Sequence, residues 1–392
     1  MHAAHLCTDV THFGCHATGL VRCDGALAAA LRACESAGGG VLPFEAGEYL
    51  LGPFALPPSI SLLVRARATL RAAPPSDADW PRLPPFPSYD GATARYSPFI
   101  RVVNATGASL RGEGASSVID GGGAAWWDAQ AAGTLNATRP VLVSAERTRG
   151  FVLANLTLRQ TPFWASHIWA SENVLVDGLV VRNPSSSPNG DGVDVDSSRD
   201  VLLRRLDVST SDDHVAIKSG AGEAGRRFAM PSANVTVADC TFRAGLGVAI
   251  GTEMSGGVHG VRVVRNTFGL GAQSVARIKS APGRGGTMTD LVWEDNVARG
   301  TVVAVSVQMA YKPGPPENAS SPGTPHLTGL AVRNLTGFSL RGGELLCLAE
   351  SPCSGIELAN ITLTAALGWT CEYAHGRAEG VKPAPNCLAA YS

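Results

Sequence analysis

Three aspartates in the middle of the chain have a spacing that would bring their side chains together. Asp191 lies in SPNGDGVDVDSS, and Asp212 and Asp213 lie in STSDDHVAIKSG, about 21 residues later, which is one turn of a parallel coil of strands. Residues one turn apart stack at roughly 4.8 Å, so we expect one carboxylate cluster. Because side chains alternate along a straight strand, Asp212 and Asp213 also require a bend before Val215.

A carboxylate cluster suits acid–base catalysis. Repulsion between like charges raises the pKa of one carboxyl group and leaves a neighbour ionised, which separates a general acid from a general base. Hydrolysis of a glycosidic bond needs that pair, and a carboxyl separation of about 6.5–9.5 Å leaves room for a water that inverts the anomeric centre. The alternatives for the same aspartates are solvated turn residues or a calcium site.

Two cations further along the chain indicate the charge of the substrate. Arg277 and Lys279, in ARIKSAPGRGG, lie two positions apart and therefore on one side of a strand. Above a carboxylate cluster they would compensate its charge and could bind a substrate carboxylate, Arg277 in a bidentate manner. This favours a uronic acid polymer over a neutral glycan as the substrate. The alternative for the two cations is that they are charges on an exposed strand edge with no role in binding.

The elements that must position these residues are short strands in a repeat. The same short phrase returns along the chain at variable intervals, the shortest a little over twenty residues, which indicates a coil of fixed turn length with loops of variable length inserted. The segments are short and lack helical periodicity, so we predict that they are strands of an all-β fold. We expect a parallel β-helix rather than a leucine-rich horseshoe. The repeated phrases are GFVLANLTLRQ, ENVLVDGLVVRN, RDVLLRRLDVST, ANVTVADCTFRA, HGVRVVRNTFGL, TDLVWEDNVARG, TGLAVRNLTGFS and SGIELANITLTA.

The repeat predicts a single domain over residues 1–392. Residues 1–60, approximately, would form the N-terminal cap and first rungs, and residues from about 365 to 392 the C-terminal cap. A short helix is expected at GALAAALRACESAGGG, where a run of Ala and Leu ends in three glycines. It would cover the apolar layer and strand edge at the open end of the coil.

Composition narrows the function class. The net charge of −1 excludes the basic footprint of a general nucleic-acid binder, and 45 Gly and 25 Pro among 392 residues favour turns and short strands. No apolar run approaches the roughly 18 residues of a membrane span. We therefore expect no nucleic-acid partner and no membrane span. We also expect the protein to be a monomer.

Cysteines and glycosylation sequons point to the secretory route, although MHAAHLCTDVTHFG shows no signal peptide. Without a CxxC pair or His at finger spacing, disulfides are favoured over zinc, and we expect Cys347–Cys353 and Cys371–Cys387, with Cys240 as a packing residue. The alternative reading of the sequons is that Asn and Thr are frequent at turns. Sequons begin at Asn104, Asn136, Asn155, Asn234, Asn318, Asn334 and Asn360.

The chain resembles glycoside hydrolase family 28, the polygalacturonases and related pectinases, and most closely their plant-type branch. The Asn-Thr-Asp-Gly block of the family resembles Asn189-Gly190-Asp191-Gly192, its Asp-Asp pair falls on Asp212-Asp213, and its Arg-Ile-Lys falls on Arg277-Ile278-Lys279. Similarity covers nearly the whole chain, from VTHFGCHATG through VIDGGGAAWW and GVAIGTEMSGG to SPCSGIELANITL.

The resemblance implies a right-handed β-helix that hydrolyses α-1,4-galacturonosyl links with inversion and needs neither metal nor cofactor. Asp212 would be the general acid, and Asp191 and Asp213 would hold and activate the water. Arg277 and Lys279 would bind the substrate carboxylate. Further substrate contacts are expected from Asn189, Tyr311 and His167, and His214 is a weaker candidate for the cleft wall.

Two departures from the family pattern leave alternatives open. Leu246, between Gly245 and Gly247, stands where many members have His, and Gly190 replaces the Thr of the Asn-Thr-Asp block. The insert GAGEAGRRFAMP is long enough to close one end of a cleft, which favours exo cleavage. The alternatives are a rhamnogalacturonan or xylogalacturonan hydrolase, a calcium-dependent pectate lyase and a pectin-binding protein of weak activity.

Overall fold

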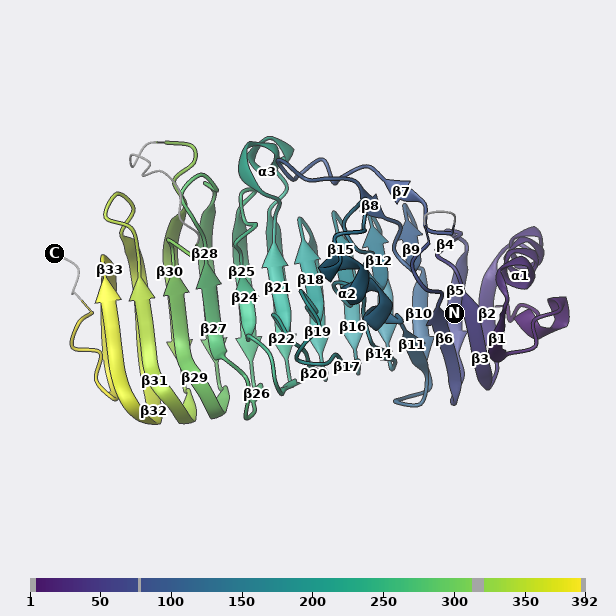
Figure 1. Ribbon diagram of the computed structural model, residues 1–392. Coiled ribbons are helices and arrows are strands. Elements are labelled where there is room, and N and C mark those ends of the chain that lie inside the picture. The colour runs from purple at the N-terminus through teal and green to yellow at the C-terminus, as the bar shows by residue number, and fades with distance from the viewer. Residues whose placement is uncertain (1–4, 77–78, 312–320, 389–392) are drawn as a thin grey trace. The chain divides into compact units, whose positions relative to one another are not determined.

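The computed structural model describes residues 5–76, 79–311 and 321–388. The chain divides into two compact units, described separately here: Met1–Pro85 with Thr93–Val193, and Phe86–Ala92 with Asp194–Ser392. The division falls within strand β18 (Val193–Asp196). Both units are built from short parallel strands, each paired with strands one repeat away along the chain (Figure 1). This confirms the predicted parallel β-helix.

The first unit contains three parallel ladders, because successive turns of the chain contribute strands to each. One short antiparallel pair, β7 (Arg82–Leu83) and β8 (Arg95–Tyr96), lies outside them. The first ladder is β1 (Thr18–Arg22), β3 (Gly47–Leu51), β6 (Ala68–Ala72), β11 (Val118–Asp120), β14 (Thr157–Arg159) and β17 (Val180–Arg182). The second is β2 (Gly40–Phe44), β5 (Ile60–Val64), β10 (Ser109–Gly112), β13 (Val152–Ala154) and β16 (Glu172–Asp177). The third is β4 (Phe54–Leu56), β9 (Ile100–Val103), β12 (Val143–Glu146) and β15 (Ser166–Trp169).

The second unit repeats this plan, and its later strands are long enough to serve two ladders. β29, for example, pairs with β26 at one end and with β27 at the other. The first ladder is β19 (Arg199–Arg204), β22 (Ser232–Ala238), β25 (Val258–Val264), β28 (Thr287–Glu294), β30 (His326–Arg333), β32 (Cys353–Glu372) and β33 (Ala374–Lys382). The second begins with β20 (Asp207–Ser209), β23 (Thr241–Phe242) and β26 (Thr267–Phe268), and the third with β21 (Val215–Lys218), β24 (Val248–Ile250) and β27 (Ser274–Lys279). Both continue into β29 (Val297–Gln308), β31 (Thr336–Leu346) and β32.

The apolar core follows the register that the repeated phrases predict. The second residue of each phrase pairs with its counterpart one turn later, and each side chain in the resulting column is at most 2% exposed, so the apolar layer is continuous through the second unit. The column is Val201, Val235, Val261, Leu291, Leu330 and Ile356.

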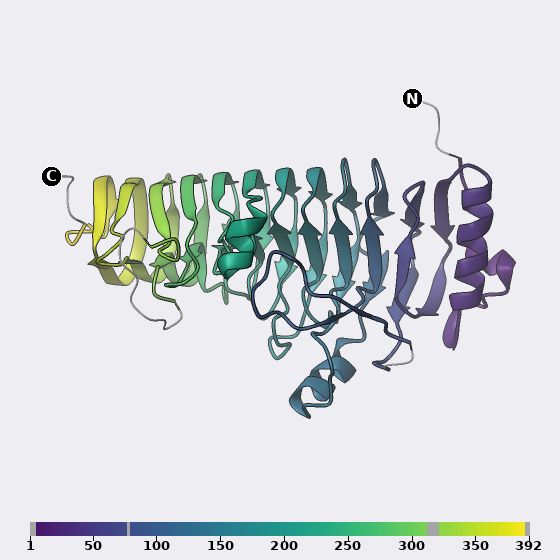
Figure 2. The same cartoon turned by 90° about the horizontal axis from the view of Figure 1, so that it is seen from above.

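The predicted capping helix is α1 (Asp24–Ser36), which lies against β2 and β5 (Figure 2). Its apolar side buries Leu27, Leu31 and Cys34, so the helix covers the first strands of its unit. The glycines that follow end the helix, and Gly38 and Gly39 have φ of 92° and 86°, in the left-handed region. A 3-10 turn, η1 (Val10–Phe13), packs beside it, and α2 (Gly123–Ala131) and α3 (Gly222–Phe228) are the other helices of the described residues.

Four disulfides are present, among them both predicted C-terminal pairs. Cys347–Cys353 and Cys371–Cys387 are confirmed, and Cys7–Cys34 and Cys15–Cys23 lie near the N-terminal helix. Cys240 is a buried free thiol, as expected for a packing residue, and burial raises its pKa to about 12. No described helix is both long and apolar enough to cross a membrane.

The bend within each repeated phrase explains why Asn and Asp recur there. Residues at these bends have φ near +50°, a conformation that Asn and Asp tolerate better than most residues. Asn104, Asn155, Asn234, Asn334 and Asn360 all adopt it, so the fold alone accounts for Asn at these sequon positions. Glycan attachment stays a prediction, and Asn318 lies outside the described residues.

Two buried asparagines stabilise successive bends of the second unit. The Asn266 side chain accepts a hydrogen bond from the Cys240 N–H (2.9 Å) and donates one to the Val237 carbonyl (3.1 Å). Asn296, one turn later, accepts from the Asn266 N–H at 2.9 Å and donates to the Val263 carbonyl at 2.8 Å. The ladder thus pairs backbone groups that the bends would leave buried without partners.

We expect Asn266→Ala to lower the free energy of unfolding by about 2–4 kcal/mol, because it leaves a buried N–H and a buried carbonyl unpaired. Urea denaturation followed by tryptophan fluorescence measures the loss. The matched control is Asn136→Ala, since Asn136 is exposed and, unlike Asn234, does not have the positive φ that Ala tolerates poorly; a loss below about 1 kcal/mol is expected there. Equal shifts in both variants would contradict the role of the ladder.

Candidate active site

The aspartate pair lies in a bend before strand β21, as predicted. Residues 211–214 are not part of a strand, and β21 begins at Val215. Val215 and Ile217 point into the core and are fully buried. The bend lets Asp212 and Asp213 both face the outer side of the ladder, which a straight strand would prevent.

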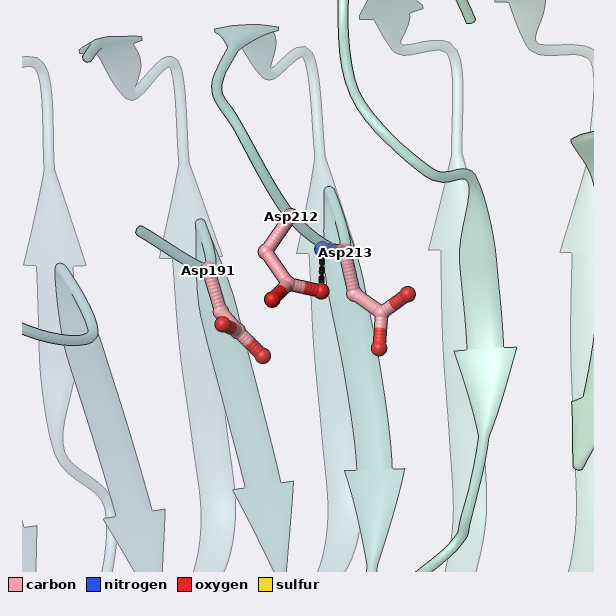
Figure 3. A group of neighbouring side chains, drawn as sticks. All are labelled: Asp191, Asp212 and Asp213. Carbon is pink, nitrogen blue, oxygen red and sulfur yellow. Dashed lines mark hydrogen bonds between the residues drawn. The ribbon is translucent and has the colours of Figure 1, made fainter. Parts of the chain in front are cut away.

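Asp213 is a buried carboxylate held by two cations. It is 1% exposed, and its Oδ2 accepts a hydrogen bond from Lys279 Nζ at 2.8 Å, while Arg277 Nε lies 3.6 Å from Oδ1. The N–H of Asp213 donates to Oδ1 of Asp212 at 2.9 Å, the dashed line in Figure 3. The pairing compensates the cost of burying the carboxylate and fixes its position.

Arg277 and Lys279 project from β27 on the same side, beside Tyr311. The guanidinium of Arg277 donates to the Tyr311 hydroxyl at 3.3 Å, and the Arg277 and Lys279 head groups lie 5.5 and 5.4 Å from the Tyr311 ring centre. Tyr311 is 38% exposed, whereas both cations are largely buried. The structure therefore brings together Asp213 and three residues that the sequence assigned to substrate binding.

Asp212 has the electrostatics of an acid. Burial raises the pKa of its carboxyl group, the negative charge of Asp213 raises it further, and Lys279, the Asp213 N–H and Lys218 partly oppose this rise. A carboxyl group with a raised pKa keeps its proton at a pH where ordinary carboxyls have lost theirs, which a general acid requires.

A second charged group in this unit was missed from the sequence. Lys218 Nζ lies 2.6 Å from Asp194 Oδ1, and both side chains are at most 5% exposed. Burial acts to raise the pKa of Glu253, but Lys218 and Arg284 lower it to about 2. Lys218 therefore links Asp194, Glu253 and Asp212 electrostatically. The sequence could have indicated it, because side chains alternate along β21 and Lys218 lies on the side opposite the apolar Val215 and Ile217.

The first unit carries the other predicted site residues. Asp191 is 4% exposed, and its carbonyl accepts a hydrogen bond from the Ala165 N–H at 2.8 Å. Asn189 is exposed at φ 50°, and its Oδ1 accepts from Arg139 at 3.0 Å. Figure 3 draws Asp191 together with Asp212 and Asp213, which belong to the second unit.

Neither histidine singled out from the sequence is exposed. His167 is fully buried, with its ring 5.0 Å from that of Trp164 in an edge-on arrangement. The expectation that His214 lines the cleft is wrong. The Gly247 N–H donates to its Nδ1 at 3.1 Å, its ring lies 5.0 Å from Phe242, and burial lowers its pKa to about 4. The bend turns His214 into the core as a neutral packing residue.

Leu246, the residue in the family's His position, lies next to the acid. Its N–H donates to the Asp212 carbonyl at 2.9 Å, and its side chain is half-buried. An apolar side chain there supplies no charge that could alter the pKa of Asp212.

The insert after β21 folds as α3 and packs within its own unit. The Ala224 N–H, in its first turn, donates to the Asp90 carboxylate at 3.0 Å, and Arg226 donates to the carbonyls of Gly283 and Arg284. The insert is therefore an ordered element rather than a loose loop.

Comparisons with known proteins identify related sequences and a related fold. Residues 88–382 match the family model described as Glycosyl hydrolases family 28. A probable polygalacturonase of Vitis vinifera is 30% identical over 89% of this chain and 73% of that protein, and an endo-polygalacturonase of Pectobacterium carotovorum subsp. carotovorum is 26% identical over 82% and 79%. The structure of an exopolygalacturonase from Thermotoga maritima is similar with a TM-score of 0.84 at 23% identity, covering 96% of this chain and 91% of that one.

Proposed function

The chain belongs to glycosyl hydrolase family 28, and we propose that it hydrolyses α-1,4-galacturonosyl links of pectin with inversion at the anomeric carbon. The observation that carries the proposal is the placement of Asp212, whose carboxyl pKa is raised, beside Asp213, a carboxylate paired with Lys279. An acid and a base with separate environments suit hydrolysis by inversion. The pair is close, because one carboxylate oxygen of Asp212 lies within 4.8 Å of one of Asp213, which is shorter than the roughly 6.5–9.5 Å expected between inverting carboxyl groups.

In the proposed mechanism Asp212 donates its proton to the glycosidic oxygen as the bond to the anomeric carbon breaks. Asp191 and Asp213 hold a water on the opposite face of the sugar and accept its proton as its oxygen bonds to that carbon. The products are a free hydroxyl on the leaving sugar and an inverted hemiacetal. Arg277 and Lys279 bind a substrate carboxylate, and Tyr311 and Asn189 add substrate contacts. The contact expected from His167 is not retained, because its side chain is fully buried.

We propose exo cleavage, and the ordered insert that contains α3 supports it. Rhamnogalacturonan and xylogalacturonan hydrolysis are the second candidates, since Leu246 stands where many family members have His. A pectin-binding protein of weak activity is the non-enzymatic alternative.

Incubation with polygalacturonate, rhamnogalacturonan and xylogalacturonan tests the proposal. We expect reducing ends to appear fastest from polygalacturonate, with short products and with the β-anomer as the first product seen by proton NMR, unaffected by a chelator. A fast fall in viscosity would contradict exo cleavage, and activity confined to another polymer would move the assignment to that substrate. Release from none of the three would overturn the enzymatic proposal.

We further propose that the protein acts outside the cell, at the plant cell wall, as a monomer. Four disulfides support this location, because such bonds persist in oxidising compartments.

A further inference from the structure

A buried cation in the first unit has spare hydrogen-bonding capacity. Arg139 is 5% exposed; its Nη1 donates to the carbonyls of Pro162 (2.6 Å) and Pro188 (2.7 Å), and its Nη2 to Asn189. A guanidinium has five N–H groups, so two have no partner among the described residues. No described carboxylate forms an ion pair with Arg139, although Asp191 acts electrostatically on it.

The spare N–H groups belong to a residue that lines a cavity of about 460 Å³. Amide and hydroxyl side chains, which suit sugar hydroxyls, make up much of the rest of the lining: Thr93, Gln130, Asn136, Thr138 and Asn189. The volume falls within the range of about 300–1,000 Å³ usual for ligand pockets. A buried cation without an ion-pair partner is costly, so an anionic ligand is a partner that would further offset this cost.

The cavity is close to the catalytic machinery along the chain. Asn189, which Arg139 holds, precedes Asp191 by two residues. The Arg139 guanidinium lies 4.9 Å from the Phe163 ring centre and is thereby fixed in position. A sugar in the cavity would belong to a chain that also passes Asp191.

We propose that this cavity binds a galacturonosyl unit of the substrate through the Arg139 guanidinium, as a second carboxylate site besides Arg277 and Lys279. The inference rests on the proposed function, because it takes the pectic chain as the ligand. It assigns Arg139 to substrate recognition, a role that no motif in the sequence indicates.

Calorimetry with tetragalacturonate and its carboxyl-reduced form tests the site, in an Asp212→Asn background that prevents turnover. We expect Arg139→Met to raise the Kd for tetragalacturonate about tenfold or more and to leave that of the reduced form nearly unchanged, because only the acid has a carboxylate to lose. Gln130→Glu, on the exposed side of α2, should act in the same direction by adding a negative charge to the cavity.

If Arg139→Met does not fold, Gln130→Glu still tests whether the cavity binds a carboxylate of the substrate. Arg111→Met, at an exposed cation of β10 outside the cavity, is the matched control and should bind like the parent. If the parent binds tetragalacturonate and the cavity variants bind it equally well, the cavity proposal is overturned and the proposed function stands. If the parent binds neither oligosaccharide, both are overturned.

Discussion

Asp212→Asn is expected to lower kcat on polygalacturonate by about 10³-fold, within the range of roughly 10²–10⁴ that general acid catalysis contributes. The amide matches the protonated carboxyl in size but cannot donate a proton to the leaving oxygen. Burial and the charge of Asp213 raise the pKa of Asp212 and so favour its uncharged form, and the uncharged amide should fit the same surroundings. Initial rates of reducing-end release measure the effect.

Binding separates the chemical role of Asp212 from a structural one. The variant should bind tetragalacturonate with nearly the parental Kd, since the cations that hold the substrate carboxylate remain. Asp239→Asn is the matched control, because Asp239 is exposed and pairs with Arg265 at 2.8 Å, a surface pair of little energetic value. An Asp212→Asn enzyme within tenfold of the parent would show that another group supplies the proton.

Much of the fold could be predicted because a solenoid repeats one local arrangement. Each turn buries its apolar face against the next, so the spacing of phrases fixes the register, and Val235 pairs with Val261 as their matching positions in the phrases require. The same logic predicts Asp212 one turn after Asp191. The N-terminal disulfide pairs could not be predicted, because several pairings of neighbouring cysteines fit the sequence equally well.

Side chains whose partners come from unrelated segments escaped prediction. Arg139 binds carbonyls of two distant loops, and nothing in its local sequence marks it. His214 was assigned to the wrong side, because alternation holds only within a strand and the bend before Val215 breaks it. Local periodicity therefore predicts positions within strands well and side-chain direction at bends poorly.

Lys279→Met is expected to lower kcat/KM on polygalacturonate by about 10–100-fold and to move the alkaline limb of the pH–rate profile to higher pH. The loss arises because a charge-assisted hydrogen bond contributes about 1.5–3 kcal/mol and Lys279 is assigned to the substrate carboxylate. The shift has a definite sign. Asp212 must be protonated to act, so activity falls as pH rises through its pKa, and Lys279 lowers that pKa. Removing the ammonium therefore raises the pKa and extends activity upward.

The two effects can be measured independently. With a carboxyl-reduced oligogalacturonate the loss in affinity should disappear, whereas the shift of the alkaline limb should remain, because it depends on the enzyme alone. Lys382→Met, the same substitution at an exposed residue of β33, should change neither. An alkaline limb that stays in place or moves to lower pH would mean that Lys279 does not act on the proton donor. Lys279, which pairs with Asp213 at 2.8 Å, would then not act both on the substrate carboxylate and on the pKa of Asp212.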